Sequence, residues 1–261
     1  MKLKLSLCQM DIVPGNPDIN RDKAICMINE AAEYKPDVIM LPEMWTTAYE
    51  LEGIKSICDV EGKPSLDIIS SRAKSHGINI LAGSFANLID DKVYNSAYVL
   101  NRYGDTIGHY NKIHLFRLMK EDKYITAGKQ LCVFEINDIK CGLIICYDLR
   151  FPELSRRLAL EGINILFVPA QWPKAREQHW MTLLTARAIE NQIFVVAVNR
   201  AGSRADDVFA GCSMVIDPWG EVLFKADYKE QIHNIEIDLN KIEEVRSKIN
   251  VYKDRVPELY I

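Results

Sequence analysis

One five-residue phrase, Gly-Ile-Asn-Ile-Leu, occurs twice in this chain, at 77–81 and at 162–166. Each copy follows a segment with helical spacing, over 66–76 and over 153–161. A glycine that ends a helix and an apolar, β-branched run that begins a strand together predict a helix-to-strand unit. Repeated units of this kind favour a layered α/β protein. The five identical residues are weak evidence for an ancestral duplication, because any buried strand draws on the same amino acids.

The first residues predict a strand with one buried face. Leu3, Leu5 and Leu7 fall on one side, and Lys2 and Lys4 fall on the other. Further strands are expected over 37–43, 77–83, 142–145, 163–168 and 194–198, hairpins over 93–110 and 213–224, and helices over 24–32, 66–76, 153–161, 178–190 and 239–249. No linker is visible, so residues 1–261 are predicted to form a single domain, in which 251–261 is a tail that either frays or docks on a partner subunit.

Composition excludes several classes of protein. The 32 basic and 36 acidic side chains are mixed along the chain, which predicts no nucleic-acid surface. No segment approaches the ~20 apolar residues that cross a bilayer, so no membrane association is expected. The seven cysteines are scattered and odd in number, a pattern typical of a reducing compartment. We expect a cytoplasmic protein.

Common cofactor and metal motifs are missing. No Gly-x-Gly occurs, and Gly128-Lys129 lacks the rest of a phosphate loop. There is no His-Glu-x-x-His, and Cys141 and Cys146 have no second pair to complete a zinc site. A serine nucleophile elbow is also missing. The sequence therefore predicts neither a cofactor nor a metal.

Cys146 is the candidate nucleophile. It follows the apolar run 142–145 and precedes a predicted helix start at Pro152. A thiol at a helix start is expected to have a lowered pKa, and the backbone N–H of Tyr147 is placed to face an oxyanion. The alternative is that Cys146 is a buried small hydrophobe, as most cysteines are.

Glu43 and Lys112 are candidate partners of this thiol, because each follows a predicted strand. In layered α/β proteins such strand ends converge on one crevice. A buried glutamate with a raised pKa acts as base and then as acid, and a nearby ammonium stabilises a thiolate and an oxyanion. The alternative is a structural ion pair or two solvated charges.

Three segments resemble the signatures of the carbon-nitrogen hydrolase, or nitrilase, superfamily, in the order of that family: 41–43, 111–115 and 146–154. The similarity extends to Asp217-Pro-Trp-Gly220. The resemblance implies a four-layer α-β-β-α sandwich that forms homodimers through its helices. It also implies that Glu43 is the general base, Lys112 the oxyanion-stabilising cation and Cys146 the nucleophile.

A second glutamate of that family falls at Glu121. The adjacent Asp122 makes this assignment ambiguous, and an exposed loop carboxylate is the alternative. Arg150 and Glu153 also lie in the motif and are interpreted as helix-start residues.

Within the superfamily, segments 169–176, 179–180 and 185–192 are similar to bacterial ω-amidases, which hydrolyse the terminal amide of 2-oxoglutaramate and 2-oxosuccinamate. Such substrates carry a carboxylate, so Arg176 is the candidate clamp and Trp172 a candidate pocket wall. The alternatives are an exposed arginine covering Trp172 or Trp180, and a core tryptophan.

The function expected from this resemblance is cysteine-dependent hydrolysis of a small carboxylate-bearing amide through a thioester, with water as co-substrate. Deaminated glutathione amidase, N-carbamoyl amidohydrolase, aliphatic amidase and nitrilase activities of the same superfamily stay open. From another class, a non-catalytic metabolite-binding or redox-sensing thiol protein also stays open.

Overall fold

Two β-sheets form the centre of the molecule, and the computed structural model describes residues 1–204 and 207–260. The first sheet has the order β15-β1-β2-β4-β5-β6, with β3 beside β4, and the second has the order β14-β13-β10-β9-β8-β7. The strands of the first sheet are β1 (Lys2–Gln9), β2 (Val38–Met40), β3 (Asp59–Val60), β4 (Asn79–Ile89), β5 (Lys92–Leu100), β6 (Thr106–Asn111) and β15 (Gln231–Asp238). Those of the second are β7 (Cys132–Ile136), β8 (Ile139–Leu143), β9 (Ile165–Ala170), β10 (Phe194–Asn199), β13 (Met214–Ile216) and β14 (Val222–Lys225). The short strands β11 (Ser203–Arg204) and β12 (Asp207–Val208) pair separately.

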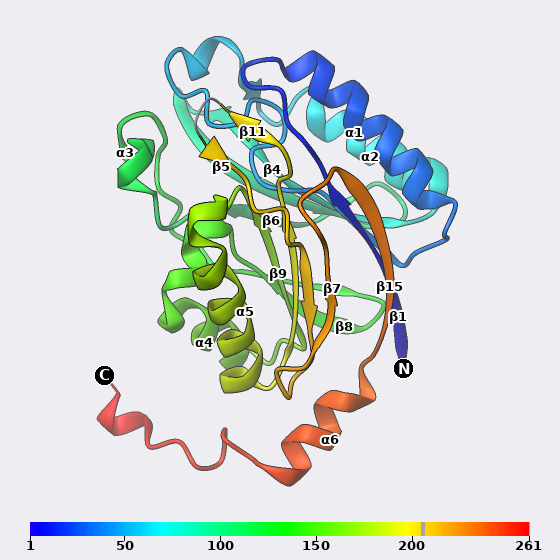
Figure 1. Ribbon diagram of the computed structural model, residues 1–261, viewed down its shortest axis with the longest axis vertical. Coiled ribbons are helices and arrows are strands. Elements are labelled where there is room, and N and C mark those ends of the chain that lie inside the picture. Colours follow the sequence, from blue (N-terminus) through cyan, green and yellow to red (C-terminus); the bar gives the residue numbers. More distant parts are fainter. Residues whose placement is uncertain (205–206, 261) are drawn as a thin grey trace.

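Helices cover the outer face of each sheet. On the first sheet lie α1 (Pro17–Ala32) and α2 (Ser65–His76), and on the second lie α4 (Pro152–Leu160) and α5 (Glu177–Asn191). Figure 1 shows these two helix pairs on opposite sides of the molecule, with the sheets between them. The predicted four-layer α-β-β-α sandwich is therefore confirmed.

The faces of the two sheets that look at each other form the main hydrophobic core. Leu3, Leu5 and Leu7 of β1 are buried in the same cluster as Phe167 of β9 and Val196 of β10. Lys2 and Lys4 are exposed, as the alternation predicts. Burial of this face fixes the register, because a slip of one residue would turn all three leucines away from the core between the sheets.

Both helix-to-strand units have the predicted form. Gly77 follows α2 with φ +67° and β4 begins two residues later, and Gly162 follows α4 with φ +89° before β9. A residue other than glycine would be strained at these left-handed positions. The predicted hairpins are also present as the pairs β5·β6 and β13·β14.

The chain after β8 differs from the prediction. Cys146–Arg150 form a short 3₁₀ helix, η3, that the sequence did not predict, and α4 then begins at Pro152 as predicted. Phe151 between them is extended, with φ −106° and ψ 97°, because a residue before proline avoids the helical region. The thiol thus lies at the start of a single 3₁₀ turn, where less partial positive charge accumulates than at the end of a long helix.

The chain ends in α6 (Asn240–Lys248) and a tail that leaves the sheets (Figure 1). Tyr252 is held near the body by Arg156 and Arg246, whose guanidinium groups lie over its ring. Beyond it, Leu259 is 77% exposed and Tyr260 is 61% exposed. Ile261, the last residue of the predicted tail, lies outside the described residues. Across residues 1–204 and 207–260, no helix combines the length and apolarity needed to span a bilayer.

Candidate active site

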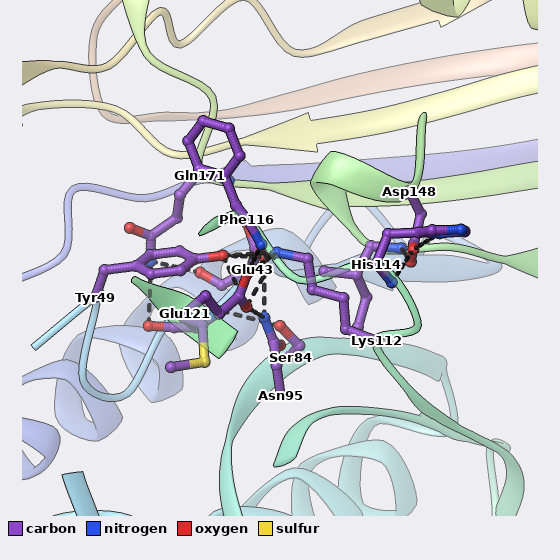
Figure 2. Close-up of polar contacts among 12 residues, drawn as sticks. Glu43, Tyr49, Ser84, Asn95, Lys112, His114, Phe116, Glu121, Asp148 and Gln171 are labelled. Atoms are coloured by element: carbon purple, nitrogen blue, oxygen red, sulfur yellow. Dashed lines mark hydrogen bonds and ion pairs between the residues drawn. The ribbon is translucent and has the colours of Figure 1, made fainter. Parts of the chain in front are cut away.

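Four strand ends, two from each sheet, deliver polar side chains to one place. Glu43 comes shortly after β2, and Lys112 comes directly after β6 of the same sheet. Cys146 and Gln171 follow β8 and β9 of the other sheet. Figure 2 shows the side chains of Glu43, Lys112 and Gln171 converging between these strands. The sheet-to-sheet packing therefore brings together residues that are more than 100 positions apart.

Lys112 lies at the centre of this cluster and is fully buried. Its Nζ is 2.9 Å from Oε1 of Glu43, 2.8 Å from the hydroxyl of Tyr49, and 3.1 and 3.0 Å from the two carboxylate oxygens of Glu121. An ammonium has three N–H donors, so these four oxygens share them. The geometry fixes the position of the positive charge from several sides.

Both carboxylates are held by further donors. Tyr49 and Asn95 each donate to Oε1 of Glu43, over 2.6 and 3.0 Å. The backbone N–H of Gln171 donates to the other oxygen of Glu43, and the N–H of Phe116 donates to Glu121. With every oxygen hydrogen-bonded, neither carboxylate can rotate without losing partners.

Glu121, and not its neighbour Asp122, is the residue beside Lys112. Glu121 begins the short helix α3 (Glu121–Tyr124) and is fully buried. Asp122 is exposed and lies 3.9 Å from Arg117. The ambiguity in the sequence is resolved by which of the two side chains points inward.

Two glycines allow the backbone to pass close to these residues. A Cβ on Gly83 would lie 2.0 Å from the carbonyl oxygen of Pro42, next to Glu43. A Cβ on Gly128 would lie 1.9 Å from the carbonyl oxygen of Asn111, and the N–H of Gly128 donates to the carbonyl of Lys112. Both approaches are too close for any other residue, so each glycine helps to fix one charged side chain.

Cys146 has a strained backbone that a buried carboxylate holds in place. Its φ is +46°, in a region that residues other than glycine rarely adopt and that often marks functional sites. Asp148 accepts hydrogen bonds from the N–H of Ile145 and the hydroxyl of Tyr110, at 3.0 and 2.7 Å. It also accepts from the N–H of His114, two residues after Lys112. Asp148 thus connects the turn of Cys146 to the strand end that carries Lys112.

The charges of the cluster shift the pKa values of its members. Burial would lower the pKa of Lys112, but the charges of Glu121 and Glu43 outweigh it and hold the pKa above the ordinary lysine value. Burial would raise the pKa of Glu43, but the charge of Lys112 and the hydrogen bonds from Tyr49 and Lys112 bring it below the ordinary glutamate value. For Glu121, burial dominates and the pKa is raised. The glutamate with the expected raised pKa is thus Glu121. The expectation of a raised pKa for Glu43 is wrong, because Lys112 and three other donors contact its carboxylate.

Burial and the charge of Glu43 raise the pKa of the Cys146 thiol well above its ordinary value, although Lys112 acts in the opposite direction. The expected lowering is wrong, because the thiol is almost fully buried and faces a carboxylate at the start of only one 3₁₀ turn. The charge of Glu43 acts directly on the thiol. Cys146 therefore rests as a thiol whose proton has a carboxylate acceptor beside it.

A narrow cavity opens beside the thiol. Lys112, Cys146 and Tyr147 line it, and both predicted pocket residues, Trp172 and Arg176, lie in its wall. The indole N–H of Trp172 donates to the carbonyl of Arg176, which fixes the two relative to each other.

Arg150 also lines the cavity, which the sequence interpretation as a helix-start residue missed. Its guanidinium lies over the ring of Trp172 at 4.7 Å, and that of Arg176 lies over Phe116 at 5.5 Å. Glu153, interpreted in the same way, lies in the first turn of α4 as expected. Within residues 1–204 and 207–260, no cluster of His, Cys, Asp and Glu is arranged to hold a metal ion.

A family model described as carbon-nitrogen hydrolase matches residues 4–247. The chain belongs to the carbon-nitrogen hydrolase family. It is 44% identical to a 2-oxoglutaramate amidase of Bacillus subtilis, over the full length of both chains. It is 32% identical to omega-amidase NIT2-B of Xenopus laevis, with 99% of this chain and 97% of that protein covered. A solved carbon-nitrogen hydrolase superfamily protein of Xanthomonas campestris has a TM-score of 0.92 at 30% identity, with 98% of both chains covered.

Three residues of this hydrolase site were not predicted from the sequence: Tyr49, Asn95 and Gln171. All three are buried and contact Glu43. A signal existed for Asn95 and Gln171, which are amide side chains in or at the end of otherwise apolar strands. Tyr49 lies in a segment without periodicity, so its direction could not be inferred.

Proposed function

We propose that this chain is a cysteine-dependent ω-amidase that converts 2-oxoglutaramate or 2-oxosuccinamate and water into the dicarboxylic acid and ammonia. The observation that carries the proposal is the position of Glu43, which lies 2.9 Å from Nζ of Lys112 and whose charge acts on the Cys146 thiol, beside an arginine-lined cavity. The names of the relatives from Bacillus subtilis and Xenopus laevis support the same activity.

In the first half-reaction, Glu43 takes the proton of Cys146 while the sulfur attacks the amide carbon. The lowered pKa of Glu43 keeps it ionised and able to accept this proton. The tetrahedral oxyanion is stabilised by the charge of Lys112 and by the N–H of Tyr147, which lies in the first turn of η3 and has no intrahelical partner there. Glu43 then passes its proton to the nitrogen, and ammonia leaves a thioester behind.

In the second half-reaction, Glu43 takes a proton from water while the hydroxide attacks the thioester. Collapse of the second tetrahedral intermediate breaks the carbon–sulfur bond, and the proton returns to the sulfur. Glu121 acts by holding Lys112 and, through the Phe116 N–H, the adjacent loop. No redox change occurs in either step.

Arg176 is proposed to bind the carboxylate of the substrate, and Arg150 lies in the same cavity wall. Neither guanidinium has a carboxylate within ion-pair distance in the part of the chain that the structure describes. A partly buried guanidinium without an acidic partner is costly unless a ligand supplies the negative charge. Trp172 forms the wall between them.

The deciding experiment measures ammonia release from 2-oxoglutaramate by the purified protein and by Cys146→Ala. Turnover that the variant lacks supports the proposal. Turnover of deaminated glutathione, an N-carbamoyl amino acid or a nitrile in place of the oxo-amide would leave the thiol mechanism standing and assign another branch. Reversible oxidation of Cys146 without any turnover would favour a sensor thiol.

We further propose that one domain takes in residues 1–261 and works as a homodimer, with the tail 251–261 docked on the partner subunit. The exposed Leu160 on α4 and the exposed Tyr260 line one groove, and with the exposed Leu259 they support an apolar contact there. Light scattering of the full chain and of a chain ending at residue 250 tests this, since only the full chain should be dimeric. The seven free thiols support a cytoplasmic location.

A further inference from the structure

The charges that line the active-site cavity are of one sign. Lys112, Arg150 and Arg176 contribute three cations, and no carboxylate of the described residues lines it. The nearest acidic groups, Glu43 and Glu121, lie behind Lys112 and are both in contact with its ammonium. A ligand in this cavity therefore meets positive charge along its length.

Of the two guanidinium groups that line the cavity, that of Arg150 belongs to the element of the nucleophile. Arg150 ends the same 3₁₀ helix that Cys146 begins, so its backbone position relative to the sulfur is fixed by one short element. Burial lowers the pKa of Arg150, and the charges of Arg176 and Cys146 also act on it. Arg176 lies against Phe116, and its carbonyl accepts from the indole N–H of Trp172.

Arg150 is also restrained in direction. Its guanidinium lies on the face of Trp172 and one of its nitrogens is 3.3 Å from Nδ1 of His179. Stacking on a buried indole leaves the edge of the guanidinium, with its N–H groups, directed along the ring plane. Such an arrangement favours a ligand oxygen at this point and disfavours a second cation.

We propose that Arg150 is a selectivity residue that faces carbon 2 of the substrate, donates a hydrogen bond to a 2-oxo oxygen there and excludes a 2-ammonium group. This inference rests on the proposed function, because it requires that an ω-amide place its amide at Cys146 and its carboxylate at Arg176. The 2-amino counterpart of 2-oxoglutaramate is glutamine, which has the same amide, the same carboxylate and the same chain length. Its ammonium would lie beside Arg150 with no carboxylate of the cavity to neutralise it.

The test compares kcat/KM for three amides that differ only at carbon 2: 2-oxoglutaramate, glutaramate with a methylene, and L-glutamine. Wild type is expected to prefer them in that order. In Arg150→Gln, the preference for 2-oxoglutaramate over glutamine is expected to fall at least about tenfold. Relative to glutaramate, kcat/KM should fall for 2-oxoglutaramate and rise for glutamine. Arg150→Lys keeps the charge and is expected to keep the exclusion of glutamine.

Arg117→Gln is the matched control. Arg117 is close in sequence to the cavity but is 87% exposed and does not line it, so its variant should leave all three ratios within about twofold of wild type. Wild type that hydrolyses glutamine as well as glutaramate would overturn the inference. So would an Arg150→Gln protein with native circular dichroism and unchanged ratios.

Calorimetric binding of the same three compounds to Cys146→Ala separates this inference from the proposed function. If Cys146→Ala binds the three compounds in the expected order but wild type hydrolyses none of them, the selectivity of Arg150 stands and the amidase proposal fails. Equal affinities for glutamine and glutaramate would overturn the selectivity even where hydrolysis is observed.

Discussion

Replacement of Lys112 by methionine removes the single cation between two buried carboxylates. In the native protein, Lys112 lies 2.9 Å from Glu43 and 3.0 Å from Glu121, and all three side chains are fully buried. Breaking a buried ion pair from one side costs about 3–5 kcal/mol of folding free energy, because the remaining charge has no partner. For a chain of this size, that corresponds to a melting temperature lower by roughly 6–20 °C.

The loss should depend on pH with a defined sign. Without Lys112, the pKa values of Glu43 and Glu121 in the folded variant rise above those in the unfolded chain. Each carboxyl group then contributes stability below its unfolded pKa, and that contribution is lost as pH rises through its folded pKa. The gap between wild type and Lys112→Met should therefore be widest near pH 8 and should narrow toward pH 5.

The assay is equilibrium unfolding in urea, followed by tryptophan fluorescence at pH 8 and pH 5. Lys112→Met/Glu121→Gln removes one of the two uncompensated charges and should recover about 0.5–3 kcal/mol relative to the sum of the single changes. Lys123→Met, an exposed lysine on α3, is the control and should be neutral. The electrostatic reasoning would be refuted if the free energy of unfolding of Lys112→Met at pH 8 were within about 1 kcal/mol of the wild-type value, which is close to the error of such data.

Three other substitutions test parts of the site. Glu43→Gln should lower kcat about 10²–10⁴-fold in the ammonia assay. Because the folded pKa of Glu43 lies below its ordinary 4.5, ionised Glu43 stabilises the fold above that value, and this contribution is lost as pH falls through the folded pKa. In urea unfolding, the loss of stability in Glu43→Gln relative to wild type should therefore be smaller in acid than at pH 7. Asp148→Asn should lower kcat by about 100-fold with less effect on KM, because asparagine has one acceptor oxygen where two carboxylate oxygens accept from the N–H groups of Ile145 and His114, and an unchanged kcat would contradict this role. Gly128→Ala should cost about 1–3 kcal/mol in the same unfolding assay, since its Cβ would meet the carbonyl of Asn111, whereas a neutral change would mean that this backbone can move.

Some features of this site can be predicted because they depend on local sequence. Glu43 and Cys146 each follow an apolar strand and Lys112 follows the second strand of a hairpin, and in a layered α/β protein strand ends meet at a crevice. The layers themselves follow from the helix, glycine and strand order at Gly77 and Gly162. The structure brings Glu43, Lys112 and Cys146 together, and the chemical roles of these three residues stay predictions.

Other features depend on distances that no local pattern contains. The direction of the pKa shift of Glu43 is set by how many donors reach it, and two of them, Tyr49 and Asn95, come from segments whose orientation is fixed only by tertiary packing. Arg150 was missed for a similar reason. An α-helix continuing from Cys146 would direct Arg150 differently, and only the break at Phe151 and Pro152 leaves it in a 3₁₀ turn that faces the cavity.

The charge balance of the cluster explains how a thiol with a raised pKa can still serve as a nucleophile. Ionising Cys146 by release of its proton to solvent would add a negative charge to a buried site that already contains two carboxylates and one ammonium. Transfer of the same proton to Glu43 leaves the net charge of the site unchanged and moves the negative charge from oxygen to sulfur. The thiolate then lies near Lys112 and Arg150, whose charges both favour it. The thiol can therefore stay protonated at rest, resistant to oxidation, and lose its proton only as an amide carbon arrives to accept the electron pair.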